Sequence, residues 1–271
     1  TTEIYTLSLH DALPIYHTPG YGSAAKYIAN TLMEIAYDMI AYRKGKVTIV
    51  EIMGRHAGWL TAASAIASLN GYGPDLIYLP EVPFSIERFK QDVKKVYEQK
   101  KQCLVAVSEG IHNEDGVLIG SSSGLKDAFG HFQLGGVSSK LANILMTDLG
   151  ISSRSVELGS TQRAAAHLQS LTDVNEAIAV GRKAVQLMLE GVTDVMVTIE
   201  RKSNHPYESF FSSQPLHLVA NQEKTIPVDW ITKEKNGVNE HFLEYALPLI
   251  EGENPPKYEN GIQRFTTFKK S

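Results

Sequence analysis

The chain has 271 residues, of which 43% are hydrophobic and 21% are charged, and its formal net charge is -4. These proportions are ordinary for a globular protein, and the length suits one large domain or two smaller ones. The lack of excess basic residues argues against nucleic-acid binding, and no apolar run is long enough to predict a membrane-spanning helix.

Residues 1–15 show neither helical nor strand periodicity, and they lack the basic and apolar leader of a secreted protein, so a cytoplasmic protein is expected. The stretch TLSLHDALPI at residues 6–15 resembles one translated frame of a common sequencing adapter. We therefore interpret residues 1–15 as a non-native segment joined to a truncated gene and leave them out of the fold prediction. The alternative is a genuine N-terminal extension.

Helices and strands alternate in the prediction for residues 16–160. Helices are predicted over residues 23–42, 57–69, 85–99 and 135–149, and strands over residues 47–52, 75–79, 103–108 and 153–158. The single cysteine, Cys103, starts an apolar strand and is expected to be a buried thiol. This alternation predicts an α/β fold with a doubly wound, mostly parallel sheet and helices on both faces.

The pattern changes after residue 160. A long helix is predicted over residues 173–190, a strand over residues 194–201 and a final helix over residues 240–250. Residues 205–225 are predicted to be irregular, and a tail rich in Pro and Gly ends the chain.

Polar residues that suit ligand binding follow two of the predicted strands. The carboxyl ends of parallel strands share one edge of a doubly wound sheet, and ligands bind at that edge. Gly54 in Met53-Gly54-Arg55 allows close backbone approach, and the guanidinium of Arg55 suits phosphate oxygens. Glu109 offers a carboxylate that accepts hydrogen bonds from sugar hydroxyls. The alternatives are a solvated arginine and a capping carboxylate.

Two arginines nine residues apart, Arg154 and Arg163, form a second candidate group around the last predicted strand of this region. Two guanidiniums that converge on one phosphate give charge-assisted, bidentate hydrogen bonds. The spacing is equally compatible with two surface arginines.

Several motifs occur in an order that is typical of one enzyme family. They are TPGYGSA at residues 18–24, EIMGRHAGW at 51–59, PEVPF at 80–84, AVSEG at 106–110, DAFGH at 127–131 and the pair Gln162-Arg163. With these motifs, the chain resembles the phosphofructokinases from about residue 16 to its end.

The resemblance implies an enzyme of glycolysis that converts fructose 6-phosphate to fructose 1,6-bisphosphate. It implies that Met53 and Gly54 contact the sugar and the transferring phosphoryl group, and that Arg55 also stabilises the charge of the transition state. Glu109 is expected to hold sugar hydroxyls, and Arg163 to clamp the 6-phosphate.

A second subunit is expected to complete the site. The resemblance implies that Arg154 clamps the same phosphate from a neighbouring subunit, together with Lys46, and therefore that the protein is a homodimer or homotetramer. Ser160 departs from the family pattern, because many members have histidine at that place.

The resemblance also divides the chain. Residues 16–160 are expected to form the fructose 6-phosphate-binding domain, 161–226 to belong to a phosphoryl-donor domain, and 227–271 to be an extension that packs back on the first domain. Residues 161–215 would then lack a partner sheet and expose apolar side chains.

The family's catalytic aspartate pair and its Gly-rich phosphate cradle lie upstream of the segment that matches residues 18–24. The Mg²⁺ ligands are expected there too, so the chain is interpreted as a C-terminal fragment that is inactive alone. The sequence MGRHAGWLTAA and the long tail after Pro227 resemble the members of this family that use pyrophosphate and lack allosteric control. The alternatives are an ATP-dependent enzyme and a non-catalytic sugar-phosphate-binding subunit.

Overall fold

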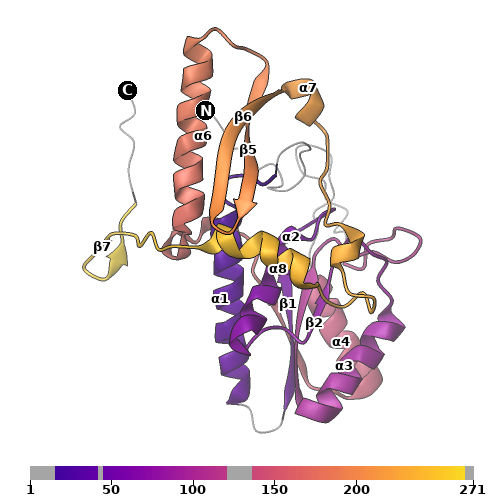
Figure 1. The fold of residues 1–271 in the computed structure, drawn as a ribbon. Helices are drawn as coiled ribbons and strands as arrows, with labels where there is room; N and C mark the ends of the chain where they lie inside the picture. The colour runs from indigo at the N-terminus through magenta and orange to yellow at the C-terminus, as the bar shows by residue number, and fades with distance from the viewer. Residues whose placement is uncertain (1–15, 42–44, 121–135, 266–271) are drawn as a thin grey trace.

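A parallel sheet lies at the centre of the lower half of the molecule in the computed structural model, which describes residues 16–41, 45–120 and 136–265 (Figure 1). The sheet has four strands in the order β2-β3-β1-β4, and every pair is parallel. The strands are β1 (Lys46–Ile52), β2 (Leu76–Tyr78), β3 (Gln102–Ser108) and β4 (Ser153–Glu157). The segment interpreted as non-native and the DAFGH motif lie outside the described residues.

Helices cover both faces of this sheet. The α-helices of the described ranges are α1 (Tyr21–Ile40), α2 (Trp59–Ala63), α3 (Ile86–Lys100), α4 (Val137–Leu149), α5 (Thr161–Ala164), α6 (Leu171–Leu189), α7 (Leu216–Val219) and α8 (Glu240–Ala246). Helices α1, α2 and α8 share one hydrophobic core with the sheet, and α3 and α4 share another with its opposite face. The predicted α/β fold with helices on both faces is therefore confirmed. None of the helices within the described ranges is both long and apolar enough to cross a bilayer.

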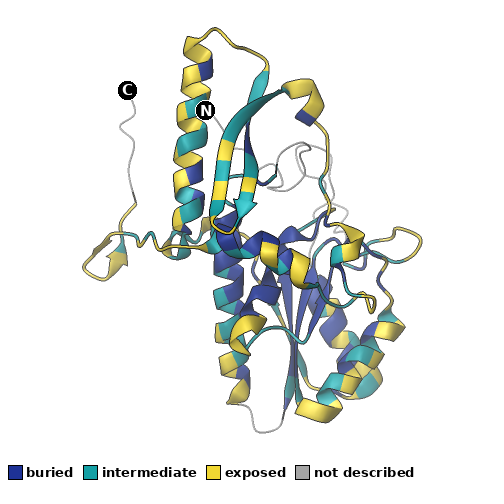
Figure 2. Cartoon of the chain, in the orientation of Figure 1, coloured by how far each residue is buried: buried dark blue, intermediate teal, exposed yellow. Residues whose placement is uncertain are grey.

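The central strand β1 is buried on both faces. Val47 and Ile49 enter the core under α3 and α4, whereas Val50 and Ile52 enter the core under α1. All four side chains are 0% exposed, which explains why the strand reads as a continuous apolar run (Figure 2). Cys103 is buried as predicted, and burial raises the pKa of its thiol well above the ordinary value.

Part of the region predicted to be irregular forms one strand of a hairpin. Strands β5 (Val195–Asn204) and β6 (Tyr207–Pro215) pair in antiparallel fashion, and α7 follows directly. The prediction that residues 205–225 are irregular was wrong over β6. This strand is held by hydrogen bonds to β5, and the sequence of β6 alone does not reveal that partner. The predicted helix over residues 57–69 is divided into α2 and a 3-10 helix, Ser64–Asn70.

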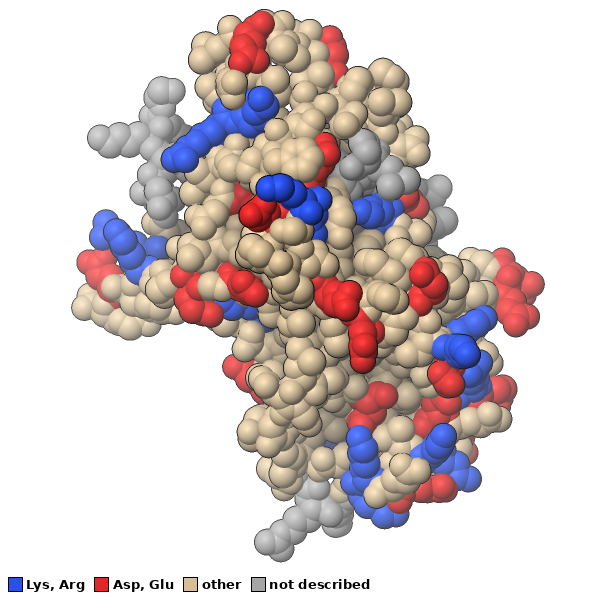
Figure 3. All heavy atoms as spheres, in the orientation of Figure 1, with Lys and Arg blue, Asp and Glu red and all other residues tan. Residues whose placement is uncertain are grey.

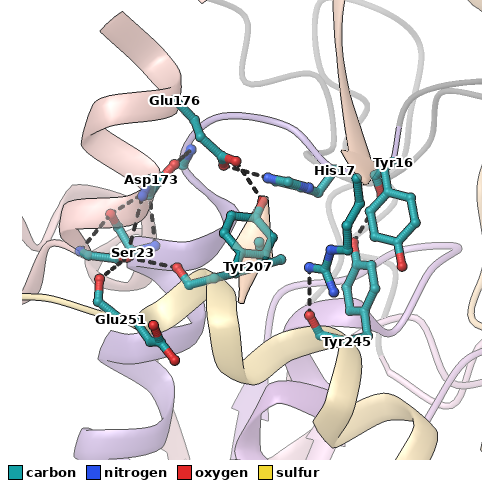
Figure 4. A network of polar contacts seen from close by, with 12 residues as sticks. Tyr16, His17, Ser23, Asp173, Glu176, Tyr207, Tyr245 and Glu251 are labelled. Atoms are coloured by element: carbon teal, nitrogen blue, oxygen red, sulfur yellow. Dashed lines mark hydrogen bonds and ion pairs between the residues drawn. The ribbon is translucent and has the colours of Figure 1, made fainter. Parts of the chain in front are cut away.

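A buried polar network ties the start of α1 to α6 (Figure 4). The carboxylate of Asp173 accepts hydrogen bonds from the backbone N of Gly20 at 2.6 Å, from the backbone N of Ser23 at 3.0 Å and from the Ser23 hydroxyl. Unpaired backbone N–H groups at a helix start carry partial positive charge, so a carboxylate there is stabilising. Here a residue of α6 provides the cap for α1.

Glu176, one turn further along α6, joins two more segments. Its carboxylate accepts a hydrogen bond from His17 Nε2 at 2.6 Å and another from the Tyr207 hydroxyl at 2.5 Å. Burial pushes the pKa of Glu176 upward, but the hydrogen bonds and the charge of His17 outweigh burial, so the pKa lies below its ordinary value. The network therefore connects the chain before α1, helix α6 and strand β6.

Tyr16 is fixed from several sides. Its carbonyl oxygen accepts hydrogen bonds from Lys224 Nζ and from the Tyr245 hydroxyl, each at 3.0 Å. Its ring lies 4.6 Å from the Arg201 guanidinium and 4.8 Å from Lys224 Nζ, which are cation–π distances. Burial lowers the pKa of Lys224 to about 8, and the charge of Arg201 adds to this effect. The residue where the described chain begins is thus tied to the hairpin and to α8.

Replacing Glu176 with glutamine tests the network. Because the folded-state pKa of Glu176 is lowered, its stabilising effect is present above the ordinary carboxyl pKa of about 4.3 and is lost as the pH falls through the folded value. We expect Glu176→Gln to lower the free energy of unfolding by about 1–3 kcal/mol at pH 7, and by less at pH 4. Urea unfolding at several pH values measures this difference.

The matched control is Glu190→Gln, which changes an exposed carboxylate directly after the same helix and should alter stability by less than about 0.5 kcal/mol. An equal loss at pH 7 and pH 4 for Glu176→Gln would contradict the assigned role.

The outer surface of α6 and the hairpin is unusually apolar. Figure 3 shows Lys and Arg closely intermixed with Asp and Glu around α3, whereas tan areas with fewer charged side chains between them lie over α6 and the hairpin. The exposed large side chains of this region include Val185, Met188 (65% exposed), Leu189 (79% exposed) and Phe210, and Leu218 is exposed on α7 directly after the hairpin. Apolar side chains were expected to be exposed here, and their covering by a partner sheet stays a prediction.

The double variant Met188→Glu/Leu189→Lys should reduce aggregation of the isolated chain without changing its melting temperature. Both side chains already lie in solvent, so no packing is lost, whereas the apolar contact area between molecules shrinks. Light scattering against protein concentration measures the effect. Val228→Glu, at a residue that is 66% exposed but outside this surface, is the control and should change scattering little.

Candidate functional site

Three strand ends meet at one edge of the parallel sheet. The register pairs Ile52 with Ser108, and Glu51 with Glu157, so β1, β3 and β4 end side by side. The segments that follow these strands therefore start at the same edge, as expected for a doubly wound fold.

The segment after β1 is held against the segment after β3. The backbone N of Gly54 donates to Glu109 Oε1 at 3.2 Å, and its carbonyl accepts from Gly110 N at 3.0 Å and from Ser108 Oγ at 2.5 Å. Gly54 has φ 154°, a conformation that side chains with a Cβ atom rarely adopt. This glycine therefore lets two strand ends approach each other closely.

Glu109 is the carboxylate at this edge on which two arginine charges act. Burial raises the pKa of its carboxyl, while the Gly54 N–H and the charges of Arg55 and Arg163 oppose that rise. Both guanidiniums thus lie within electrostatic reach of one carboxylate. The structure brings together the predicted site residues from three separate segments, namely Gly54, Arg55, Glu109 and Arg163.

Gln162 positions the segment after β4. Its side chain is buried, with the amide oxygen accepting from the Met53 backbone N at 3.3 Å and the amide nitrogen donating to the Gly159 carbonyl at 2.9 Å. The neighbouring Thr161 accepts from the Tyr27 hydroxyl of α1 at 3.0 Å. The sequence indicated Gln162 only through its pairing with Arg163 in a family motif, and the link to Met53 could not be predicted from it.

Lys46 and Arg154 lie at the other end of the strands. Arg154 pairs in register with Thr48, donates to the Thr48 hydroxyl at 3.2 Å and forms an ion pair with Asp38 at 2.6 Å. Lys46 is the first residue of β1. Three residue steps along β4 place Arg154 about 10 Å from the strand end, so one chain does not bring these cations to Glu109.

A buried carboxylate near this edge was missed by the sequence analysis. Glu51 lies in β1 and accepts hydrogen bonds from the backbone N of Ser138 at 2.9 Å and from its hydroxyl at 3.0 Å. Burial raises the pKa of Glu51, and the charges of Glu157 and Glu109 raise it further. The sign of this buried carboxylate in the sequence was a single acidic residue inside the otherwise apolar run VTIVEI. This contact ties the start of α4 to the site edge.

The described residues do not fit a Mg²⁺ site. Among residues 16–41, 45–120 and 136–265, no three His, Cys, Asp or Glu side chains are grouped so that they could hold a metal ion. Glu51 and Glu109 already accept hydrogen bonds from the protein. No step of the chemistry is therefore assigned to a metal held by these residues.

Gly110→Ala tests whether the close approach at this edge is required. A Cβ atom on Gly110 would lie 1.8 Å from the carbonyl oxygen of Arg55, and backbone atoms cannot move aside cheaply. We expect a loss of about 1–3 kcal/mol in the free energy of unfolding, measured by urea unfolding.

Gly181→Ala on α6 is the matched control, because nothing lies within 4 Å of the added Cβ atom. It should raise stability by up to about 1 kcal/mol, since alanine favours a helix over glycine. If Gly110→Ala left the free energy of unfolding unchanged, this result would contradict the close packing of Gly110 against the Arg55 backbone.

Comparison with known proteins places the chain among enzymes. The family model described as phosphofructokinase matches residues 10–188. This match includes the last residues of the segment interpreted as non-native, so the boundary at residue 15 stays a prediction. The pyrophosphate–fructose 6-phosphate 1-phosphotransferase of Halomonas elongata is 42% identical over 262 residues, which is 95% of this chain and 62% of that protein.

Two further relatives agree with this match. A sulfofructose kinase of Alkalicoccus urumqiensis is 34% identical over 241 residues, covering 89% of this chain and 62% of that protein. The crystal structure of a pyrophosphate-dependent phosphofructokinase from Marinobacter aquaeolei superposes with a TM-score of 0.83 at 35% identity, over 96% of this chain and 62% of that one. The predicted resemblance is confirmed, and the chain belongs to the phosphofructokinase family.

Proposed function

We propose that this chain binds the acceptor of a phosphotransferase that converts fructose 6-phosphate to fructose 1,6-bisphosphate, with pyrophosphate as donor. The observation that carries this proposal is the meeting of Gly54, Arg55, Glu109 and Arg163 at one sheet edge. The names of the Halomonas and Marinobacter relatives support the donor. The chain spans only about 62% of those proteins, so the complete reaction is part of the proposal.

Glu109 and Gly54 provide the hydrogen-bonding groups for the sugar. A carboxylate accepts hydrogen bonds from hydroxyls, and Glu109 is held in place by the Gly54 N–H at 3.2 Å. Because Glu109 is half-buried, its bonds to a ligand would be stronger than the same bonds in open water. This pair would orient the sugar ring, and Met53 would pack beside it.

The two guanidiniums have different roles in the proposal. Arg163 is exposed at the end of a turn fixed by Gln162, and it would form bidentate hydrogen bonds with the 6-phosphate. Arg55 would neutralise charge on the phosphoryl group as it is transferred to the sugar hydroxyl. Fixed cations of this kind act without reorganisation during the reaction.

A second copy of the chain would complete the phosphate clamp. Lys46 and Arg154 lie at the opposite end of the strands from Glu109, so they would serve the site of a neighbouring copy. Arg154 would then exchange some of its contact with Asp38 for the phosphate. This arrangement implies a homodimer or homotetramer.

Mg²⁺ would neutralise the charge of the donor phosphates when bound, and its ligands are expected outside the described residues. For the same reason we expect the chain alone to bind the sugar phosphate but not to turn it over. A cytoplasmic location and a place in glycolysis belong to the same proposal. An ATP-dependent enzyme and a non-catalytic binding subunit are the alternatives, which donor-dependent turnover by the complete protein would distinguish.

Isothermal titration with fructose 6-phosphate tests acceptor binding by this chain. Arg163→Gln should weaken binding by about 10- to 100-fold, because a charge-assisted hydrogen bond contributes about 1.5–3 kcal/mol. Arg88→Gln removes an exposed guanidinium from α3 and is the matched control, with binding unchanged. Equal effects of the two variants, or no binding by the unaltered chain, would contradict the proposal.

A further inference from the structure

Arg163 lies on a helix that is too short to be stable by itself. Helix α5 has four residues, and the chain leaves helical geometry at Ala165. A single helical turn fixes several backbone dihedrals for about one hydrogen bond, so it needs contacts with the rest of the fold. Arg163 is exposed, so its own side chain adds little packing. The position of the guanidinium therefore depends on contacts made by the residues around Arg163.

Gln162 provides one of these contacts. Its buried side chain bonds to the Met53 backbone N–H at 3.3 Å and to the Gly159 carbonyl at 2.9 Å. Both partners belong to segments that follow strands, so this contact supports the turn from the sheet. A binding group has to be held within about 0.5 Å of its productive position, and a single support leaves a short turn free to rotate about it. A second support from another direction is therefore required.

Tyr27 supports the turn from helix α1. Its hydroxyl donates to Thr161 Oγ1 at 3.0 Å, and Thr161 Oγ1 donates in turn to the Leu158 carbonyl at 2.5 Å. The backbone N of Leu158 donates to the Glu51 carbonyl of β1 at 3.1 Å. A continuous series of hydrogen bonds therefore runs from α1, through the first residue of α5, to the central strand.

The ring of Tyr27 also contacts the chain on the other side of Arg163. It lies edge to face with the His167 ring, with the ring centroids 6.0 Å apart. Thr161 and His167 bracket Arg163 in the sequence, and both contact the same tyrosine side chain. The ring packs against the core that α1 shares with the sheet, so the hydroxyl is held in place before a ligand binds.

We propose that Tyr27 is a positioning residue for Arg163, acting through Thr161 and His167. This inference rests on the proposed function, in which Arg163 binds the 6-phosphate of the sugar. Tyr27 itself does not touch the ligand. A guanidinium that is already in place loses less conformational freedom on binding, so loss of the Tyr27 hydroxyl weakens phosphate binding without removing a ligand contact.

Isothermal titration of this chain with fructose 6-phosphate measures the effect of Tyr27→Phe, which removes only the hydroxyl. We expect binding to weaken about three- to tenfold, because a hydrogen bond that fixes the turn is lost. Thr161→Val should weaken binding to a similar extent, and adding Tyr27→Phe to Thr161→Val should cause little further loss. Thr161→Ser keeps the hydroxyl and should bind within about twofold of the unaltered chain.

A second comparison separates positioning from a general loss of stability. In the Arg163→Gln background, Tyr27→Phe should change binding by less than about twofold, because the group that Tyr27 positions is absent. A merely structural role would weaken binding equally with and without Arg163. Ligand-observed nuclear magnetic resonance, which also detects weak binding, measures the affinities of both Arg163→Gln variants.

Tyr37→Phe is the matched control. It removes a tyrosine hydroxyl from the same helix, ten residues or about 15 Å from Tyr27, and should leave binding unchanged. Unchanged binding by Tyr27→Phe, or equal weakening in the two Arg163 backgrounds, overturns this inference and leaves the proposed function intact. A lack of fructose 6-phosphate binding by the unaltered chain overturns the proposed function and this inference together.

Discussion

The parallel pairing of β1 with both β3 and β4 is the constraint on which the site depends. Because the three strands run in the same direction and in register, their carboxyl ends open at one edge. Gly54, Glu109 and Arg163 belong to segments far apart in sequence, and only this pairing makes them neighbours. The bonds of Gln162 to Met53 and Gly159 and of Gly54 to Glu109 then hold the loops in position.

The same strands keep the other predicted cations apart from this edge. Lys46 lies at the start of β1, and Arg154 pairs with Thr48 in the first half of the strand. Both strands are held in register by their parallel pairing, so the separation cannot close within one chain. These cations could take part in the proposed reaction by reaching the site of a second copy of the chain.

A second set of contacts joins α6 and the hairpin to the rest of the fold. Asp173 caps α1, and Glu176 accepts hydrogen bonds from His17 and Tyr207, so two acids on one helix fix the chain before α1 and strand β6. Their burial is tolerated because each has charged or polar partners. The apolar outer surface around Leu189 shows that packing is much less complete on the outside of this unit.

Local pattern in the sequence was sufficient for the α/β class, the buried strand β1, the burial of Cys103 and the residues at the strand ends. These features depend on periodicity and on the rule that parallel strands share an edge. Strand β6, the division of the 57–69 helix, the Glu51–Ser138 contact and the role of Gln162 were decided by tertiary structure. Each depends on a partner distant in the chain, and no pattern of neighbouring residues encodes which partner a buried polar group or an unpaired strand edge will meet.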